Sequence, residues 1–490
     1  MTTTVDQLPE ISTGLYIDGV PVAAAETLRV VDPGDGVSLV GRAASATSVQ
    51  AADAVTAAHR AFPAWSALSP AERAAALTAA LVPLEADRPA TAEILSRENG
   101  KIRLESIIDS VVFEHRCRLA IDLAGDVESS YELAGPPYRT RVRQAPLGVV
   151  TIIVPFNWPL AILGASLGYA LMAGNTVVVK PPPTAPLATA RTVALVAAAL
   201  PPGVVNVITG ADAEVGPTLI TDPRVRKVCF TGSVGGGKRI MAMASDNLTR
   251  VALELGGNDP AIILPDAVLS ADAFQNLYHG TFDTTGQVCM AVKRLYVHRS
   301  RYEEVIEGLT ALLTPTVLGH GLAESTTMGP LHRAQQKSFV TDLLAEARSR
   351  GAEIRELGSE APADGHFLRP SLVLDPPDDT RLVTEEQFGP TLPIIPFDDE
   401  ADAVARANDT WAGLTSSVWT ADLDHAAALA EQLHSGFTFV NAHGAGSLDE
   451  RAPFGGRRHS GMGREMGIEG LREFMDTHAI SFASPPPPIS

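Results

Sequence analysis

A cysteine and a glutamate stand in contexts where they could act as a nucleophile and its base. Cys289 lies in Phe282-Asp-Thr-Thr-Gly-Gln-Val-Cys-Met290, downstream of Glu254 in Leu253-Glu-Leu-Gly-Gly-Asn-Asp-Pro260. A free thiol with a pKa near 8.5 is only about 3% thiolate at pH 7, so a catalytic cysteine needs a group that lowers its pKa or accepts its proton. A lone cysteine is more often a small buried hydrophobe. These two residues alone leave both interpretations open.

The chain around Glu254 alternates between short β-branched runs and helical stretches, from about residue 147 to 265. We expect strands at 148–154, 176–180, 204–208, 225–230, 250–254 and 260–264, with helices near 160–173, 187–200, 213–221 and 237–245. This order predicts a parallel, doubly wound α/β sheet with right-handed crossovers. Nucleotides bind such sheets at the carboxyl ends of the strands, and Glu254 falls at one of those ends.

A glycine-rich segment, Gly232-Ser-Val-Gly-Gly-Gly-Lys-Arg239, follows one predicted strand and opens a helix. Backbone amides and the positive end of the helix could bind a pyrophosphate there. The spacing also approaches a P-loop, but Arg239 stands where a hydroxyl residue would coordinate magnesium, and no acidic magnesium partner is evident. A dinucleotide site is therefore favoured over a nucleotide triphosphatase.

Further motifs occur in a fixed order along the chain. They are Leu15–Gly19, Ala61–Trp65, Val154–Leu160, Gly174–Lys180, Phe230–Ser233, Glu386–Pro390, Pro453–Gly456 and Ser460–Glu465. Together with the segments around Glu254 and Cys289, they resemble the aldehyde dehydrogenase superfamily, whose NAD(P)-dependent members oxidise aldehydes to acids. The resemblance runs essentially from end to end.

The resemblance implies a role for each catalytic candidate. Cys289 would attack the aldehyde to form a thiohemiacetal, and the side-chain amide of Asn157 with the backbone N–H of Cys289 would bind the oxyanion. Glu254 would activate the water that hydrolyses the thioester, and it could also accept the thiol proton. Relatives that transfer the acyl group to coenzyme A generally lack this glutamate, so hydrolysis to the free acid is expected.

The resemblance also implies the cofactor contacts. Gly232 and Ser233 match residues at the pyrophosphate, Lys180 matches a lysine at the adenosine ribose, and Glu386 and Phe388 match residues at the nicotinamide ribose. The full expected set is Val154, Pro155, Phe156, Lys180, Pro183, Gly216, Phe230, Gly232, Ser233, Leu255, Gly256, Glu386 and Phe388. We expect NAD as cofactor, with NADP as an alternative.

Three positions depart from the family pattern. Pro183 stands where many NAD-specific members have a glutamate, which puts discrimination against NADP in doubt. Ser166 stands where most relatives have a lysine, so a proton path or a hydrogen bond to Glu254 is expected to differ. Thr284 replaces a common asparagine, which we expect to alter only the support of the catalytic loop.

Matched positions give an expected substrate tunnel lined by Ile162, Ala165, Val288, Met290, His443 and Phe454. Ala165 replaces a bulky aromatic residue of several small-aldehyde enzymes, which favours a roomier channel. No arginine or lysine is evidently placed to bind a substrate carboxylate, so a medium or bulky apolar aldehyde is favoured over a semialdehyde. His443 could face the substrate, or it could be a hydrogen-bonded loop histidine.

The resemblance implies three structural parts. Residues 1–123 and 147–256 would bind NAD(P), residues 257–455 would form the catalytic domain with Cys289, and residues 124–146 and 470–490 would form a β flap for oligomerisation. Tyr138 to Arg143 alternates as a strand does. We expect a homodimer or homotetramer, in which the flap pairs with a sheet edge of another subunit.

Composition excludes several partners and classes of site. A net charge of −19 and a pI near 5.1 argue against nucleic-acid binding. Cys117, Cys229 and Cys289 form neither a disulfide framework nor a zinc-binding pattern, so no metal is expected. The first residues show no signal-peptide pattern, which favours the cytoplasm.

One long uncharged stretch, residues 144–179, could suggest a membrane segment. Pro155, Asn157 and Pro159 interrupt it, so we expect a strand, a loop and a buried helix with no membrane insertion. A catalytically idle scaffold protein remains the alternative to the enzyme.

Overall fold

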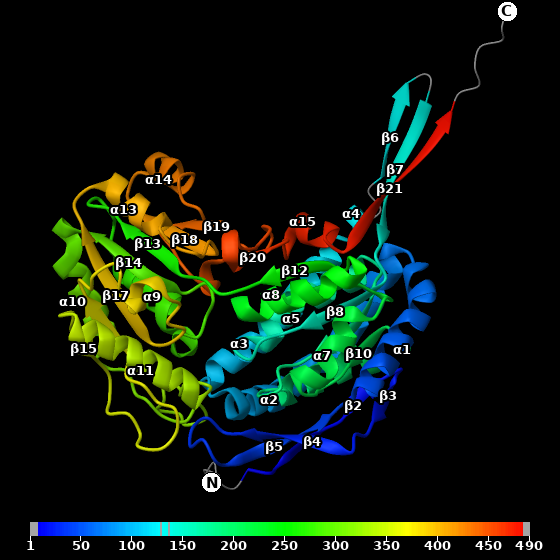
Figure 1. The fold of residues 1–490 in the computed structure, drawn as a ribbon, viewed down its shortest axis with the longest axis horizontal. Coiled ribbons are helices and arrows are strands. Elements are labelled where there is room, and N and C mark those ends of the chain that lie inside the picture. The colour runs from blue at the N-terminus through cyan, green and yellow to red at the C-terminus, as the bar shows by residue number, and fades with distance from the viewer. Residues whose placement is uncertain (1–7, 128–129, 136–137, 484–490) are drawn as a thin grey trace, which may run out of the picture.

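The computed structural model of the chain describes residues 8–127, 130–135 and 138–483. Two α/β bodies lie side by side, and a narrow β ribbon projects from one of them (Figure 1). The predicted absence of a signal peptide concerns residues that include 1–7, and the end of the predicted segment 470–490 extends past 483. Both of these parts lie outside the described residues.

An eight-stranded sheet forms the first body, in the order β20-β12-β11-β8-β9-β10-β2-β3. Its strands are β20 (Gly461–Met462), β12 (Arg250–Glu254), β11 (Val225–Thr231), β8 (Val149–Ile153), β9 (Thr176–Lys180), β10 (Val205–Val207), β2 (Leu15–Ile17) and β3 (Val20–Val22). The five strands from β12 to β10 are parallel, and β20 and β2 join antiparallel at either side. The doubly wound sheet predicted from the sequence is confirmed.

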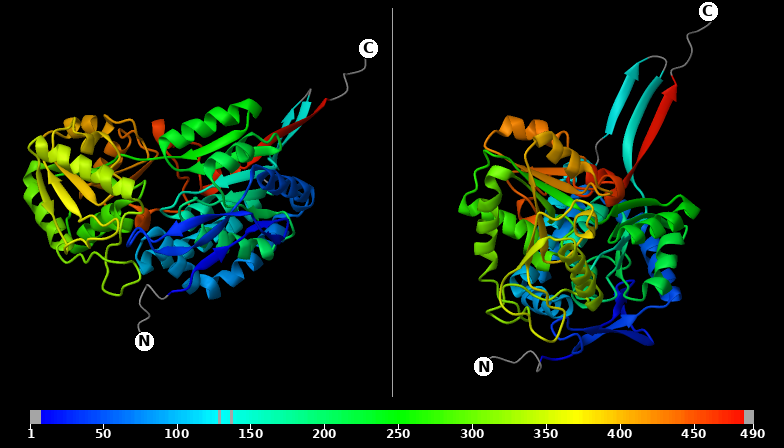
Figure 2. Two further views of the ribbon diagram at one scale, coloured as in Figure 1. Left: turned by 60° about the horizontal axis from the view of Figure 1, so that its bottom comes forward. Right: turned by 60° about the vertical axis from the view of Figure 1, so that its left-hand side comes forward.

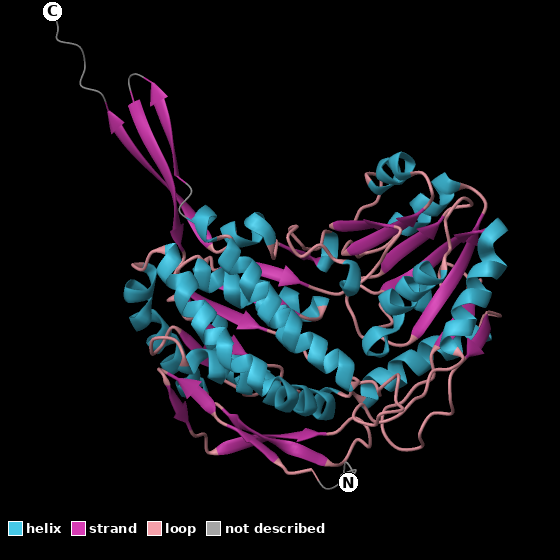
Figure 3. Ribbon diagram, turned by 180° about the vertical axis from the view of Figure 1, so that it is seen from behind, coloured by secondary structure: helices cyan, strands magenta, loops and turns pink. Residues whose placement is uncertain are grey.

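Helices cover both faces of this sheet, as Figure 3 shows from behind. They are α1 (Ser48–Ser66), α2 (Pro70–Asn99), α3 (Arg103–Asp122), α4 (Ala124–Val127), α5 (Pro159–Met172), α6 (Leu187–Ala198), α7 (Asp212–Thr221), α8 (Val234–Ala244) and α15 (Gly467–Arg472). Beside the sheet, β1 (Ile11–Thr13), β5 (Leu39–Ser45) and β4 (Glu26–Val31) form a small sheet of their own.

A seven-stranded sheet forms the second body, in the order β15-β16-β17-β14-β13-β18-β19. Its strands are β15 (Glu353–Glu356), β16 (Ser371–Leu374), β17 (Thr391–Phe397), β14 (Val292–His298), β13 (Asp259–Ile263), β18 (Thr415–Trp419) and β19 (Phe437–Val440). Its helices are α9 (Ala271–Phe282), α10 (Tyr302–Leu313), α11 (Ala334–Ser349), α12 (Arg381–Thr384), α13 (Glu400–Asn408) and α14 (Leu423–Ala430). The sixth predicted strand is therefore not part of the first sheet, because as β13 it lies in the middle of the second.

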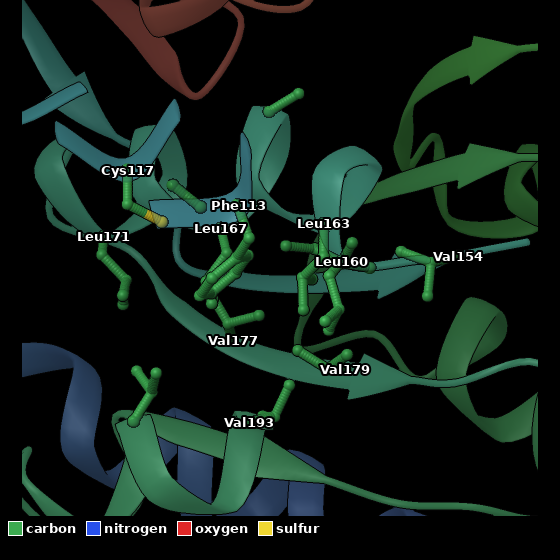
Figure 4. Packing of buried hydrophobic residues seen from close by; sticks show 14 of the residues in the cluster. Phe113, Cys117, Val154, Leu160, Leu163, Leu167, Leu171, Val177, Val179 and Val193 are labelled. Carbon is green, nitrogen blue, oxygen red and sulfur yellow. The ribbon is translucent and has the colours of Figure 1, made fainter. Parts of the chain in front are cut away.

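Helix α5 explains how the long uncharged stretch is used. Leu160, Leu163, Leu167 and Leu171 of α5 pack in the core with Phe113 and Cys117 of α3 and with Val177 and Val179 of β9 (Figure 4). Burying each leucine contributes about 1.5–3 kcal/mol. No helix within the described part of the chain is long and apolar enough to cross a membrane.

Two glycines set the distance between α5 and α3. A Cβ on Gly164 would lie 2.8 Å from the carbonyl oxygen of Phe113, and one on Gly168 would lie 2.9 Å from the Cα of Cys117. The two helices can therefore pack backbone against backbone only where α5 has no side chain. Cys117 is fully buried at this contact and behaves as a core residue.

The projecting ribbon is a three-stranded antiparallel sheet, clear of both bodies in every view (Figures 1 and 2). It contains β6 (Ser130–Gly135), β7 (Tyr138–Pro146) and β21 (Met475–Ala483), in the order β21-β7-β6. The strand predicted from Tyr138 to Arg143 is part of β7. The residue boundaries of the three expected parts stay a prediction.

Candidate active site

One cavity of about 220 Å³ brings together Cys289, Glu254 and Asn157. We call it the central cavity. Asn157 follows β8 and Glu254 ends β12, both in the first body, whereas Cys289 precedes β14 in the second body. Three residues that are far apart in the sequence therefore meet where the two bodies face each other.

The first body presents Asn157 at the switch point of its sheet. From β8 the chain runs outward through β9 and β10, and it then crosses back to β11 on the other side of β8. Ligands of doubly wound sheets bind in the crevice outside the strand ends at this point. Pro159 begins α5 there, at the first helical position, where its missing N–H costs no hydrogen bond.

A strained loop carries Cys289. Thr284 and Thr285 both adopt left-handed backbone conformations, with φ of 52° and 57°. Such conformations typically cost roughly 1–3 kcal/mol each and persist only where surrounding contacts enforce them. Here the carboxylate of Glu105 accepts a hydrogen bond from the Thr284 N–H at 2.5 Å, and the Thr285 hydroxyl donates to the carbonyl of Gly329 at 2.9 Å. The Thr284 bond is made by the backbone, and the Thr284 hydroxyl is buried without a hydrogen-bond partner among the described residues, so the effect of a threonine at this position stays a prediction.

The ammonium of Lys293 holds the loop from the other side. Its Nζ donates to the carbonyl oxygens of Val288, Cys289 and Ala291 at 2.6, 3.1 and 3.3 Å. The same ammonium lies 3.9 Å from a carboxylate oxygen of Glu386. Lys293 is buried, so these contacts replace its hydration shell.

Asn157 connects the two bodies at the nucleophile. Its side-chain Nδ2 donates to the carbonyl oxygen of Gln287 at 2.9 Å, and the residue is only 4% exposed. An amide nitrogen carries two N–H groups, so a second donor is left for an oxygen in the central cavity. Gln287 is itself fixed, because its side-chain oxygen accepts from the backbone N–H of His332 at 3.0 Å.

Cys289 is a neutral thiol in this environment. Burial raises the pKa of its thiol to about 12, the cation of Lys293 opposes that rise, and the carboxylates of Glu386, Asp259 and Glu254 add to it. Nucleophilic attack therefore requires a proton acceptor at the moment of reaction.

Glu254 has the properties of such an acceptor. Burial raises the pKa of its carboxyl well above the usual value, and the nearby charge of Glu465 raises it further. Its Oε2 is buried and has no hydrogen-bond partner among the described residues. A Cβ on Gly455 would lie 2.9 Å from Oε1, so the glycine leaves room for this carboxylate.

Ser166 does not contact Glu254. Its hydroxyl donates to Oε1 of Glu465 at 2.8 Å, and Glu465 lines the central cavity with Glu254. The pairing of β12 with β20 places Gly461 opposite Glu254, four residues before Glu465. At the position where most relatives have a lysine, this chain therefore binds a second carboxylate.

The glycine-rich segment joins the end of β11 to the start of α8. Ser233 caps α8 by accepting a hydrogen bond from Gly236 N–H at 3.1 Å, and the Gly232 N–H donates to the carbonyl of Glu254 at 3.0 Å. A Cβ on Gly232 or Gly236 would lie within 3 Å of the Phe230 ring, and one on Gly237 within 3 Å of Leu255. The glycines therefore let these two side chains pack against the helix start, and the N-terminus of α8 lies at the strand ends, where the pyrophosphate site is predicted.

The remaining cofactor candidates surround this segment. Val154, Pro155 and Phe156 follow β8, Lys180 ends β9 with Pro183 just beyond, and Gly216 lies within α7. Lys180 Nζ pairs with Asp212, the first residue of α7. Phe156 stacks on His332 at 4.3 Å between ring centroids and meets Phe388 edge-on at 6.2 Å.

Glu386 lies across the end of β12. Its Oε1 accepts from the Gly257 N–H at 3.1 Å, and a Cβ on Gly256 would lie 2.1 Å from its Oε2. Phe388, two residues later, has a φ of 47°. Both residues stand near the Cys289 loop through the contact of Glu386 with Lys293.

Four of the six predicted substrate residues line the central cavity, namely Ile162, Val288, Met290 and Phe454. Ala165 and His443 do not. Ala165 is buried on α5 in the same core cluster as Val288 and Phe454, so its effect on the width of the channel stays a prediction. His443 is buried and bonded to the Ser417 hydroxyl at 2.9 Å and to the Met290 carbonyl at 3.1 Å, and burial lowers its pKa to about 3. These contacts agree with the interpretation of His443 as a hydrogen-bonded loop histidine.

Sequence reasoning did not identify four residues of the site: Arg116, Lys293, Glu450 and Glu465. Arg116 and Glu450 also line the central cavity. Glu465 lies within the motif Ser460–Glu465, which could have marked it as a site residue. No sequence motif marks Lys293, Arg116 or Glu450. Within the described ranges, no group of three or more histidine, cysteine, aspartate or glutamate residues could hold a metal ion.

Known proteins resemble this chain along nearly its whole length. The model of the aldehyde dehydrogenase family matches residues 21–480. A glutarate-semialdehyde dehydrogenase of Pseudomonas aeruginosa is 34% identical over 469 residues, covering 94% of this chain and 95% of that protein. A mitochondrial succinate-semialdehyde dehydrogenase of Oryza sativa is 34% identical over 464 residues, covering 93% and 86%.

Solved structures agree with this chain in fold. Betaine aldehyde dehydrogenase of Staphylococcus aureus in complex with NAD+ has a TM-score of 0.90 at 30% identity, covering 97% of this chain and 95% of that one. An NADP-dependent enzyme of E. coli has a TM-score of 0.91 at 31% identity, covering 96% and 98%.

Proposed function

The chain belongs to the aldehyde dehydrogenase family, whose members oxidise aldehydes to acids with NAD(P)+, and from this premise we propose that Cys289, Glu254 and Asn157 perform its chemistry. The observation that carries the proposal is their meeting in one cavity, where Glu254 Oε2 is buried without a hydrogen-bond partner.

Addition of the thiol is the first step. The Cys289 Sγ attacks the aldehyde carbon while its proton passes to Glu254, and the carbonyl π electrons become an oxyanion. Asn157 Nδ2 and the backbone N–H of Cys289 bind this oxyanion; removing one such donor typically costs roughly 2.7–4 kcal/mol. The raised pKa of Glu254 suits this role, because it brings the carboxylate closer in basicity to the groups whose protons it accepts.

Hydrolysis is the second half of the reaction. NAD(P)+, when bound, supplies the acceptor for the hydride that leaves the thiohemiacetal carbon. Glu254 first passes the thiol proton to solvent. Water then attacks the thioester on Cys289, and Glu254 accepts the proton of that water. Collapse of this tetrahedral adduct breaks the C–S bond and releases the carboxylic acid, and the leaving thiolate takes the proton from Glu254.

We infer the finer cofactor contacts from the strand ends. Gly232 and Ser233 at the start of α8 would bind the pyrophosphate, Lys180 the adenosine ribose, and Glu386 the nicotinamide ribose. Pro183 offers no carboxylate to the ribose, so both NAD and NADP are proposed as cofactors.

We also propose the assembly and location. The β6-β7-β21 ribbon exposes Tyr131, Leu133, Tyr138 and Phe482, with 44–59% of each accessible. Apolar side chains on a projecting sheet suit an interface, so the ribbon would join subunits of a homodimer or homotetramer in the cytoplasm. The proposed domains keep their expected bounds, with NAD(P) bound by residues 1–123 and 147–256, and Cys289 within 257–455.

Turnover of the purified protein tests the proposal. Reduced-cofactor absorbance would be followed with aliphatic and aromatic aldehydes, using NAD and NADP in turn. Replacing Cys289→Ala should lower kcat/KM by roughly 10⁴-fold or more, since the nucleophile is removed. Cys229→Ala, a change at another cysteine of raised pKa, is the matched control. Residual oxidation near the wild-type rate in Cys289→Ala would refute the assigned nucleophile, and a wild type that binds cofactor but oxidises no aldehyde would favour the idle scaffold.

A further inference from the structure

We propose that an ion pair in the wall of the central cavity, Arg116 with Glu450, makes this enzyme select uncharged, largely apolar aldehydes over aldehydes that carry a carboxylate. The inference rests on the proposed function, because it takes the cavity containing Cys289 as the substrate site. Both residues line that cavity. Their side chains are only 11% and 13% exposed.

The charge of Arg116 is already paired with a carboxylate, and three of its five N–H groups are in hydrogen bonds. Its Nε and Nη2 both donate to Glu450 Oε1, at 2.9 and 2.7 Å, and its Nη1 donates to the carbonyl of Ala161 at 2.8 Å. Glu450 thus supplies the carboxylate that a substrate would otherwise have to provide. The second carboxylate oxygen of Glu450, Oε2, lies 3.5 Å from His115 Nε2 and makes no bond to Arg116.

Arg116 carries the sole guanidinium or ammonium group among the described residues that line the cavity. His279, the other basic lining residue, is bonded to Asp283 at 2.9 Å. Glu105 adds a further carboxylate to the same wall. An incoming carboxylate would therefore lose its hydration without gaining a free cation, beside carboxyl groups whose pKa values burial already raises.

The rest of the wall suits an apolar substrate. Val112, Trp158, Ile162, Val288, Met290 and Phe454 line the cavity around Cys289. Such side chains gain from covering a hydrocarbon or aromatic aldehyde. They offer no charge to a charged end group, and the indole N–H of Trp158 is the polar group among them. These side chains therefore favour an apolar aldehyde over the succinate and glutarate semialdehydes for which two of the relatives are named.

Glu450 acts through Arg116, as a positioning residue. If its charge is removed, the guanidinium loses its counter-ion and becomes available to a substrate carboxylate. Glu450→Gln should therefore raise kcat/KM for carboxylate-bearing aldehydes relative to neutral ones. The gain should appear in KM, because the new contact forms at the distal end of the substrate and not at the reacting carbon.

Matched aldehydes provide the test. Pentanal would be compared with glutarate semialdehyde, and benzaldehyde with 4-carboxybenzaldehyde, in the wild type, Glu450→Gln, Glu450→Asp and Asp449→Asn. Glu450→Asp keeps a carboxylate beside Arg116. Asp449→Asn removes the same charge one residue away, where the carboxylate is half exposed and bound to Arg451. Melting temperatures would show that each variant is folded.

We expect the wild type to favour the neutral member of each pair by about tenfold or more, and Glu450→Gln to reduce that preference by about tenfold, while both control variants retain it. Equal use of both members by the wild type, an unchanged preference in Glu450→Gln, or a wild-type preference for a trimethylammonium aldehyde would each overturn the proposal. The comparison of neutral with carboxylate-bearing aldehydes on the wild type needs no variant, so it tests the proposal even if Glu450→Gln fails to fold. Failure of the wild type on every aldehyde would instead refute the proposed function, and this inference with it.

Discussion

The two sides of the central cavity are built in different ways. Asn157, Ser233 and Glu254 lie at or just beyond the ends of parallel strands, where the hydrogen bonds of the sheet fix the backbone. Cys289 lies in a loop whose backbone is left-handed at Thr284 and Thr285. The first arrangement follows from local sequence and sheet register, whereas the second depends on side chains from remote parts of the chain.

The remote contacts are strong enough to hold the loop. The bonds from the ammonium of Lys293 to loop carbonyls are charge-assisted. Glu105 accepts from the Thr284 N–H, and burial raises the pKa of its carboxyl to about 7, so this bond is charge-assisted where the carboxyl is ionised. Hydrogen bonds to charged groups contribute about 1.5–3 kcal/mol each, which is comparable with the roughly 1–3 kcal/mol cost of each left-handed threonine. The strand-end side should therefore tolerate substitution without unfolding, and the loop side should lose order when its distant partners are changed.

The largest expected effect is at the strand-end side, where Glu254→Gln should separate activity from stability. Loss of the base should slow thioester hydrolysis by roughly 10²–10⁴-fold. The melting temperature should not fall, because a buried carboxylate of raised pKa with an unpartnered oxygen is replaced by a neutral amide. Stopped-flow absorbance should show a slowed burst of reduced cofactor, because Glu254 also accepts the thiol proton, followed by a still slower phase, and calorimetry gives the melting temperature. A variant that is destabilised, or that turns over without a burst at the wild-type rate, would contradict this expectation.

The next effect falls on Asn157, which belongs to the strand-end side but also touches the loop. Asn157→Ala removes the proposed oxyanion donor and should lower kcat/KM by about 10²–10³-fold. It also removes the bond to the Gln287 carbonyl. Measuring kcat/KM together with the Cys289 alkylation rate distinguishes these losses. If alkylation changes as much as oxidation does, the residue serves mainly to hold the loop.

A smaller effect is expected on the loop side from Lys293→Met. The loop carbonyls lose their shared donor, and a displacement of about 1 Å at the nucleophile can cost up to about 10²-fold in rate. The pKa of Cys289 should also rise further, because the Lys293 cation is the group that opposes the effect of burial. The thiolate fraction at a given pH should therefore fall, and iodoacetamide alkylation of Cys289 measured across a pH series should be slower than in the wild type.

Lys227→Met is the matched control for that experiment. Lys227 is equally buried and also pairs with a carboxylate, Glu473 at 2.8 Å, but it lies in β11 away from the loop carbonyls. Lys227→Met should therefore leave the rate of Cys289 alkylation unchanged at each pH. An unchanged profile in Lys293→Met as well would show that the loop holds its conformation without the ammonium.

The same contrast explains what the sequence could predict. The strands and helices from 148 to 254 were predictable because β-branched runs and helical stretches alternate there, and strand order then fixed which residues share an edge. The place of β13 in the second sheet could not be predicted, because no residue between Pro260 and Ile263 indicates that the chain has crossed to another sheet. Motif matches identified Cys289, but its support from Glu105 spans 179 positions of sequence.

Side-chain direction was the second limit. Ile162 and Ala165 lie one turn apart on α5, yet only Ile162 reaches the cavity, because Ala165 packs into the core. The bond between Arg116 and Glu450 joins residues 334 positions apart, and neither has a local pattern that marks it. Pairing of this kind is a property of the packed molecule and becomes visible only with coordinates.

The smallest effect should come from Glu465→Gln, which tests whether the strand-end side titrates independently of the loop. Burial is the main reason that the pKa of Glu254 is raised, and the charge of Glu465 is the next. Removing that charge should lower the pKa of Glu254 toward its usual value. Because the deprotonated carboxylate is the active base, the acid limb of the pH–kcat profile should then move to lower pH.

Burial also raises the pKa of Glu465 itself, so its charge acts on Glu254 only at pH values where Glu465 is ionised. The shift should be confined to the hydrolysis step and should leave the pH profile of Cys289 alkylation in place, since Glu465 is not among the charges that act on that thiol. A shift of both profiles would mean that the carboxylates and the nucleophile titrate as one coupled group. The two sides of the cavity would then differ in how they are built but not in how they respond to protons.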